Sequence, residues 1–399
     1  MAKIDKDEVI RYHKGGKIAV KLPKELKSKE DLCLAYTPGV AHAVKAIAAD
    51  PDAVYDVTAK PNLVAVVSDG TAILGLGDLG AAASIPVMEG KAVLFKSFGD
   101  VDAWSVPLGA CRMDGKDTGK TDPERVIAAV KAIAPQYAGI NLEDIASPAC
   151  FEIEDRLDAE LDIPVFHDDQ WGTAVIATAG VMNFAHLKGK SLGELKVVMS
   201  GAGAAGTRIA DMLKAAGVKD ITMFDIKGVL AASRKDLSKQ NSVHAREVPE
   251  TLTMREALTG ADVFIGVSAA NILKGDDVRA MGEFPAIFAM ANPDPEITPE
   301  AAREAMAGRR YVMVTGRSDY PNQINNVLAF PGIFRGALDC RARCINEEMK
   351  LAASHALADY VGDRLSPTCI LPNALDRQVA IAVAEAVARA ARETGVARK

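Results

Sequence analysis

The sequence of 399 residues lacks long apolar runs, paired cysteines and blocks of like charge. No run approaches the ~18 apolar residues that a membrane-spanning helix needs. The first residues, MAKIDKDEVIRYHKGGKI, are charged where a signal peptide would be apolar. We therefore expect a cytoplasmic protein that does not use a membrane as its partner.

Cysteine usage and charge exclude two further classes of protein. The six cysteines include no Cys-x-x-Cys pair, so we expect neither a zinc site nor a disulfide framework. The net charge of −6 is modest and no Lys/Arg block stands out, which argues against nucleic acid as a partner. The composition is otherwise that of an ordinary globular protein, for which a small-molecule substrate is the default expectation.

Length and pattern predict two α/β domains, with a tail that returns to the first. In the first half, the apolar runs LVAVV (63–67) and AVLF (92–95) alternate with Gly-rich turns, as strands would. Residues 122–137 have apolar positions at helical spacing after an Asp-Pro start, which predicts a capped helix. No internal repeat or low-complexity linker marks a boundary, so we place it near residue 160.

The second domain, over residues 161–399, is predicted to be a doubly wound parallel sheet of the Rossmann type. Residues 196–217 run from an apolar strand through a Gly-rich turn into an amphipathic helix, and ITMFD (221–225) follows as a second strand. Later apolar stretches at 263–267, 286–292 and 311–316 fit further parallel strands. The Ala-rich end is interpreted as a packing helix without chemistry.

A G-x-G-x-x-G motif follows the first of these strands and opens the helix. Its first glycine lets the chain turn, its second lets backbone amides approach a pyrophosphate, and its third lets the helix pack on the strand. The N-terminus of the helix supplies partial positive charge. The predicted dinucleotide-binding loop consists of Gly201, Ala202, Gly203, Ala204, Ala205 and Gly206.

Two charged residues bear on the choice of dinucleotide. Asp225 ends the second strand at about the distance where an acid usually meets the ribose hydroxyls, which favours NAD because a 2'-phosphate would be repelled. Lys227 could neutralise that phosphate. The sequence therefore leaves both NAD and NADP open, with a lean to NAD.

Two acidic pairs stand where strands are predicted to end, Glu143-Asp144 in GINLEDIASP and Asp168-Asp169 in IPVFHDDQWGTA. Carboxylates at such ends can converge on a hard cation such as Mg²⁺ or Mn²⁺, although surface turns also carry many acids. We expect His167 to be a buried imidazole rather than a ligand in an oxygen-rich site.

Lys91, in PVMEGKAVLFK, has two interpretations. Partial burial or a neighbouring carboxylate could tune it as a base, whereas a solvated side chain is the default for any lone lysine.

Taken together, these stretches resemble the malic enzyme family, particularly its short bacterial and archaeal form, over essentially the whole chain. The resemblance is carried in order by LAYTPGVA (34–41), VAVVSDGTAILGLGDLG (64–80), PVMEGKAVLFK (86–96), NLEDI (141–145), PVFHDDQWGTA (164–174), SGAGAAG (200–206), AMANPDPEI (289–297) and GRSDYPNQINNVLAFPGIFRGALD (316–339). It implies oxidative decarboxylation of malate to pyruvate and carbon dioxide, with NAD or NADP and with Mg²⁺ or Mn²⁺. Residues 1–160 would then be the catalytic domain of a homodimer or higher homo-oligomer.

The resemblance also implies residue roles. Tyr36 would be the proton donor, Lys91 the base that takes the C2 hydroxyl proton, and Asp168 the partner that orients the lysine. The residues that match the metal-binding positions are Glu143, Asp144 and Asp169, and those that match positions touching substrate or nicotinamide are Asn292, Asn325 and Asn326.

Two positions depart from the family pattern. The longer eukaryotic form has an arginine where this chain has Ala72, so the partner of a substrate carboxylate must come from elsewhere. The bacterial form usually has histidine where this chain has Trp171.

Two other functions remain open: an oxaloacetate decarboxylase with the same site, and a non-catalytic dinucleotide-binding protein of the same fold. The intact acid, base and metal positions argue against the second.

Overall fold

Two β-sheets organise the chain, and the computed structural model describes residues 5–115, 119–292 and 294–399. The strands are β1 Leu63–Ser68, β2 Asp102–Pro107, β3 Gly139–Leu142, β4 Val165–His167, β5 Lys196–Ser200, β6 Asp220–Asp225, β7 Gly228–Val229, β8 Val263–Gly266, β9 Ala286–Ala289 and β10 Val312–Thr315. The helices are α1 Lys6–His13, α2 Lys29–Ala35, α3 Val40–Ala49, α4 Val54–Val57, α5 Ala81–Gly99, α6 Pro123–Ile133, α7 Ala149–Glu160, α8 Asp168–Lys188, α9 Ala204–Ala215, α10 Lys239–Ser242, α11 Met254–Leu258, α12 Gly275–Ala280, α13 Pro299–Ala305, α14 Phe330–Asp339, α15 Glu347–Val361 and α16 Arg377–Glu393.

The first sheet has the strand order β2-β1-β3-β4, and every pairing in it is parallel. The strand expected at residues 63–67 is confirmed as β1, and the helix expected after Asp122 is confirmed as α6, whose first amides the Asp122 side chain caps. β4 belongs to this sheet, so the sheet extends a few residues beyond the boundary expected near residue 160.

The strand expected at residues 92–95 is wrong, because these residues lie inside α5. The buried positions of α5 recur every three or four residues, at Ala81, Ser84, Met88, Ala92 and Phe95. That spacing is the period of a helix that packs one face on a core. The four-residue run AVLF was too short to reveal the period.

The second sheet has the order β10-β9-β8-β5-β6-β7. The β5-α9-β6 unit and the later strands β8, β9 and β10 are parallel as expected, while the short edge strand β7 is antiparallel to β6. The chain moves from β5 to β6 on one side and then to β8 on the other. In a doubly wound sheet, the crevice at this reversal is where dinucleotides bind.

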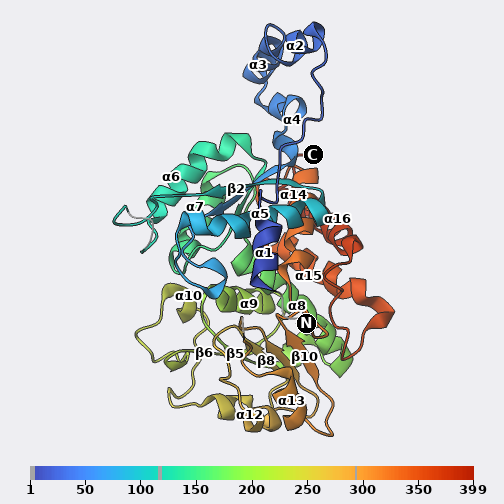
Figure 1. Cartoon of the computed structure of the whole chain (residues 1–399). Coiled ribbons are helices and arrows are strands. Elements are labelled where there is room, and N and C mark those ends of the chain that lie inside the picture. The colour runs from blue at the N-terminus through green and yellow to red at the C-terminus, as the bar shows by residue number, and fades with distance from the viewer. Residues whose placement is uncertain (1–4, 116–118, 293) are drawn as a thin grey trace.

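The C-terminal helices return to the first half of the chain. α14 and α16 pack closely on each other, since a Cβ at Gly336 would lie 2.4 Å from the carbonyl oxygen of Ala384. Both helices also contact α5, while α15 packs on α8 (Figure 1). The expected returning tail is therefore present as helices that join the two halves.

Helices α2 and α3 form an arm that extends away from the rest of the chain (Figure 1). Neither helix has a buried residue, and Leu34 and Val44 are 71% and 60% exposed. By length and composition alone, residues 29–49 are a candidate membrane span. The structure divides them into helices of 7 and 10 residues, each too short for a hydrocarbon core of about 30 Å.

Candidate active site

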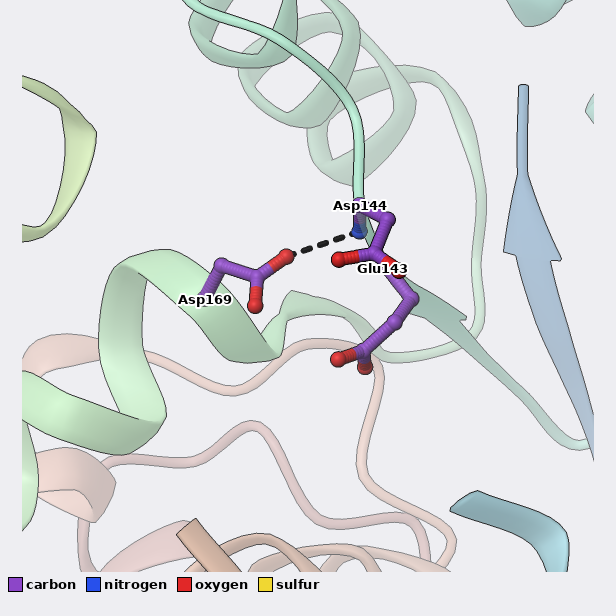
Figure 2. A group of neighbouring side chains, drawn as sticks. All are labelled: Glu143, Asp144 and Asp169. Atoms are coloured by element: carbon purple, nitrogen blue, oxygen red, sulfur yellow. Dashed lines mark hydrogen bonds between the residues drawn. The ribbon is translucent and has the colours of Figure 1, made fainter. Parts of the chain in front are cut away.

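Three carboxylates meet at the carboxyl ends of two neighbouring parallel strands. Glu143 and Asp144 follow β3, and Asp169 lies in the first turn of α8, directly after β4. One ligand oxygen from each lies within 4.8 Å of the others (Figure 2). The backbone N–H of Asp144 donates to the Asp169 carboxylate over 2.7 Å, which ties the two segments together. The structure thus brings the two acidic pairs of the sequence into one cluster.

The chemistry of this cluster fits a hard divalent cation. Glu143 and Asp144 are each only 4% exposed, and Oδ2 of Asp144 has no hydrogen-bond partner among the described residues. Burial, reinforced by the neighbouring Asp169, raises the pKa of Asp144 to about 7. Burial also raises the pKa of Glu143 well above its ordinary value. Mg²⁺ and Mn²⁺ prefer oxygen ligands, and their positive charge would compensate these buried carboxylates.

Lys91 reaches the same place from the middle of α5. Its Nζ lies 2.6 Å from Asp168 Oδ2, 2.9 Å from Glu143 Oε1 and 4.5 Å from the centre of the Phe330 ring. Burial alone would lower the pKa of Lys91, but Asp168 and then Glu143 outweigh it and raise this pKa above the ordinary value. With its side chain only 10% exposed, Lys91 is a buried, paired cation, so the solvated interpretation is wrong.

Asp168 is fully buried and holds Lys91 in place. Its Oδ2 also accepts a hydrogen bond from the Asn326 side-chain amide over 3.0 Å, and the Asn326 carbonyl accepts one from Thr173. A Cβ at Gly172 would lie 2.2 Å from Asp168 Oδ1, so a side chain at this position would displace the carboxylate. Of the three asparagines that are expected to touch substrate or nicotinamide, Asn326 therefore lies at the site, in contact with Asp168.

The other two asparagines lie elsewhere. The Asn325 side chain accepts a hydrogen bond from the Val327 amide and caps a short 3-10 helix, Asn326–Leu328. Asn292 is exposed in the loop that follows β9. Their contacts with substrate or nicotinamide stay predictions.

Tyr36 does not lie with Lys91 in its own chain. It follows the last residue of α2, on the extended arm, and is 68% exposed. The resemblance pairs these two residues in one reaction, so the site of a single chain lacks one of its expected groups.

His167, the last residue of β4, is buried as expected, with 1% of its surface exposed. Burial lowers the pKa of His167 to about 3, so the ring is neutral and its approach to Asp169 is not an ion pair. Its two ring nitrogens have no hydrogen-bond partner among the described residues.

Ala72 stands where the longer family form has an arginine, and its N–H donates to the backbone carbonyl of Asp144. Arg112 lies near the segment that contains Ala72, but it is 1% exposed and forms ion pairs with the Asp69 and Asp78 carboxylates. Arg112 is thus already paired and is a poor partner for a substrate carboxylate.

The glycine-rich loop has the close approaches that its motif predicts. Gly201 has a φ of 109°, and a Cβ at Gly206 would lie 2.0 Å from the Gly201 carbonyl oxygen. Helix α9 begins at Ala204, directly after Gly203. A cavity of about 640 Å³ opens in front of the loop and reaches Asp225 beyond the end of β6.

Arg234, which sequence analysis missed, neutralises Asp225. Its Nη1 and Nη2 donate to the two Asp225 oxygens over 2.9 and 2.7 Å, and its side chain is 8% exposed. Burial raises the pKa of Asp225, but these hydrogen bonds bring it below the ordinary value. Lys227 instead pairs with Asp236 over 2.7 Å. No motif marks Arg234, because a loop folds it back onto Asp225.

A doubly wound dinucleotide-binding domain beside a buried lysine–aspartate pair and a cluster of carboxylates is the arrangement of a nicotinamide-dependent oxidoreductase. Residues 15–158 match the family model "Malic enzyme, N-terminal domain", and residues 171–392 match "Malic enzyme, NAD binding domain". The chain belongs to the malic enzyme family.

Individual relatives agree with this assignment. A "Bifunctional malic/malolactic enzyme" of Bacillus subtilis is 50% identical over 98% of this chain and 94% of its own length. An "NAD-dependent malic enzyme" of Geobacillus stearothermophilus is 52% identical over 98% of this chain and 80% of its own length. The solved malic enzyme of Pyrococcus horikoshii is 44% identical and superposes with a TM-score of 0.91, covering 98% of this chain and 92% of that one.

Proposed function

We propose that this chain oxidises malate with NAD or NADP and releases carbon dioxide to leave pyruvate, using Mg²⁺ or Mn²⁺ held by Glu143, Asp144 and Asp169. The observation that carries the proposal is the position of Lys91, whose ammonium lies between Asp168 and one carboxylate of the cluster. A base and a cation site so close together suit the removal of a hydroxyl proton. Relatives named as NAD-dependent and NADP-dependent malic enzymes support the same reaction.

A divalent cation held by these carboxylates would supply Lewis-acid chemistry during both oxidation and decarboxylation. The protein's own part is to keep three carboxylates together, two of them buried and Asp169 partly exposed. Among the described residues Oδ2 of Asp144 has no hydrogen-bond partner, which supports this role, because a buried carboxylate oxygen without a partner costs free energy that a bound cation would offset.

Lys91 acts in the oxidation step. A divalent cation bound at the cluster would oppose the carboxylates that raise the pKa of Lys91. Lys91 in its neutral form would then take the C2 hydroxyl proton of malate while hydride leaves C2 for the nicotinamide. Asp168 fixes the position of Nζ, and Asn326 in turn fixes Asp168. The oxaloacetate formed loses its C4 carboxylate as carbon dioxide, and C3 must then receive a proton.

Tyr36 is the proposed donor of that proton, and a second copy of the chain is its proposed source. The arm that carries Tyr36 is exposed and apolar, with Leu34 and Val44 71% and 60% exposed, so it has surface to bury. In a homodimer with twofold symmetry, each arm would lie against the body of the other chain. Tyr36 of one chain would then complete the site that contains Lys91 of the other.

The function is tested with purified full-length protein, malate, Mn²⁺ and either NAD or NADP. We expect reduced nicotinamide and pyruvate to form in equal amounts, and both to disappear after treatment with EDTA. Lactate is measured in the same samples, because one relative is named malic/malolactic. Oxaloacetate without dinucleotide forms a separate arm, and loss of carbon dioxide there without any malate oxidation would show an oxaloacetate decarboxylase instead.

A further inference from the structure

One buried carboxylate, that of Glu154, accepts hydrogen bonds from both sides of the turn that carries Asp168 and Asp169. Glu154, on α7, accepts a hydrogen bond from the backbone N–H of His167 over 2.8 Å. Its other oxygen accepts one from the indole N–H of Trp171 over 3.0 Å. Residues 167 and 171 stand on the two sides of the aspartates, so one side chain holds both ends of this turn.

Two cations accompany this carboxylate. The Arg208 guanidinium lies 3.9 Å from Glu154 and 4.5 Å from the centre of the Trp171 ring, and Lys350 Nζ lies 3.5 Å from the same centre. Arg208 also donates to the Gln170 side chain over 3.0 Å, in the same first turn of α8. Arg208 comes from α9 and Lys350 from α15, so residues of four helices meet around Trp171.

Stability alone gives little reason for this arrangement. Glu154 is only 5% exposed, and an apolar side chain of similar volume would avoid the cost of burying a charge. The carboxylate does satisfy one specific need: β4 is an edge strand, and the N–H of its last residue, His167, donates to Glu154. The hydrogen bond fixes the exact place where α8 begins.

We infer that Glu154 and Trp171 are positioning residues, which hold Asp169 where it can bind a divalent cation. The inference rests on the proposed function, since it takes Asp169 to be a metal ligand. In the part of the chain that the structure describes, the side-chain hydrogen bonds of these two residues run to each other and to the His167 backbone. They therefore act on the metal site through the first turn of α8. Trp171, one of the two departures from the family pattern, is thus one of the two positioning residues.

The sharpest variant is Trp171→Phe, which keeps an aromatic face for both cations and removes the N–H together with the rest of the five-membered ring. Mn²⁺ binding to metal-free, full-length protein is measured by calorimetry, beside the melting temperature. Loss of groups that orient metal ligands typically weakens binding 10–100-fold. We expect the lower end, about 10-fold, because the effect passes through the backbone. The smaller ring should lower the melting temperature by only a few degrees, so that the variant stays folded at the assay temperature, and malate turnover should return to the wild-type level at saturating Mn²⁺.

Glu154→Gln tests the same hydrogen bond from its other end. Its amide group would face one of the two N–H donors, so Mn²⁺ affinity should fall by a similar factor. If the pair acts as one unit, the double variant binds Mn²⁺ no more weakly than the weaker single variant.

Asp155→Asn is the matched control, because the adjacent Asp155 also pairs with Arg208 but is 69% exposed and is not hydrogen-bonded to the turn. It should bind Mn²⁺ like the wild type. Unchanged Mn²⁺ affinity in Trp171→Phe and Glu154→Gln overturns the inference, as does a loss that the control shares or that occurs only where the melting curve shows unfolded protein at the assay temperature. A wild type that binds Mn²⁺ but fails to oxidise malate would refute the proposed function alone, while one that fails to bind Mn²⁺ would refute both.

Discussion

The ammonium of Lys91 lies between two buried carboxylates, 2.6 Å from Asp168 and 2.9 Å from Glu143. Replacing Lys91 with arginine keeps a cation between the carboxylates but removes the base, because a guanidinium does not deprotonate in proteins. We expect Lys91→Arg to remain folded, with malate turnover lower by ~10²- to 10⁴-fold, the usual contribution of a positioned acid or base. Circular dichroism and steady-state turnover on one preparation measure both quantities. A variant that retains wild-type turnover would remove Lys91 from the reaction.

The raised pKa of Glu154 predicts that the free energy of unfolding depends on pH. Burial raises the pKa of Glu154 to about 7, from an ordinary value of 4.5. Between these values the unfolded chain ionises this group while the folded chain keeps it protonated, so stability falls as pH rises through the window. At ~1.4 kcal/mol per pKa unit, the full shift is worth up to about 3 kcal/mol.

Glu154→Gln removes this penalty. Its melting temperature, relative to the wild type, should therefore rise as the pH is raised from about 5 to about 8. Asp155→Asn should show no such trend. Parallel melting curves for wild type and Glu154→Gln across this range would show that Glu154 is not the source of the dependence.

Arg234 changes what is expected of cofactor choice. Since it already neutralises Asp225, the acid repels a 2'-phosphate less than an unpaired carboxylate would. Asp225→Ser frees Arg234 for that phosphate and should raise kcat/KM with NADP by about 10-fold relative to NAD, a difference of ~1.4 kcal/mol. Arg234→Gln should shift the ratio the opposite way. Lys227→Gln is the control, and an Asp225→Ser ratio equal to the wild type's would exclude Asp225 from cofactor choice.

At the scale of single residues, the sequence predicted the groups that stand in recognisable words, such as Lys91 and the two acidic pairs. It could not predict Arg234 or Glu154. Their partners, Asp225 and Trp171, are reached only after a loop folds back or two helices pack, and no local spacing records that contact.

At the scale of secondary-structure elements, Gly203 and Gly206 of the glycine-rich loop have different roles. A Cβ at Gly203 would meet nothing within 4 Å, whereas one at Gly206 would lie 2.0 Å from the Gly201 carbonyl oxygen. Gly203→Ala should therefore fold with a wild-type melting temperature and lose dinucleotide affinity, by at least about 10-fold, because its methyl group occupies the place of the pyrophosphate. Gly206→Ala should lower the melting temperature, because α9 can no longer pack on the end of β5.

Thermal unfolding and dinucleotide titration of both variants measure these effects. Equal melting temperatures for Gly203→Ala and Gly206→Ala would show that the third glycine is not needed for packing.

Helices and strands were predicted well where the apolar pattern was long or where glycines marked a turn, as in β5-α9-β6. The interpretation failed in α5, where a four-residue apolar run has no visible period and the burial of every third or fourth position appears only over the whole helix. The antiparallel strand β7 has two residues, which is too short for any pattern to mark.

At the scale of the molecule, sequence pattern predicted two domains and a returning tail, since each follows from chain length and composition. The resemblance gives Tyr36 and Lys91 roles in one reaction, but no pattern in the sequence shows that they are apart in the folded chain. The position of an exposed arm depends on what covers it, and a single sequence does not contain that information.

A heterodimer of two inactive variants would show which chain supplies Tyr36 to a given Lys91. Tyr36→Phe and Lys91→Arg should each be nearly inactive alone. In a heterodimer of the two variants, one site would combine intact Lys91 with intact Tyr36 of the partner subunit, and the other would carry both substitutions. Co-expression with two different affinity tags isolates this heterodimer, which should regain about half of the wild-type turnover per dimer, because one of its two symmetric sites is intact. If Tyr36 instead acted on Lys91 of its own chain, both sites of the heterodimer would be defective. An inactive heterodimer would thus contradict the shared site, and the absence of any co-purified partner would contradict the dimer itself.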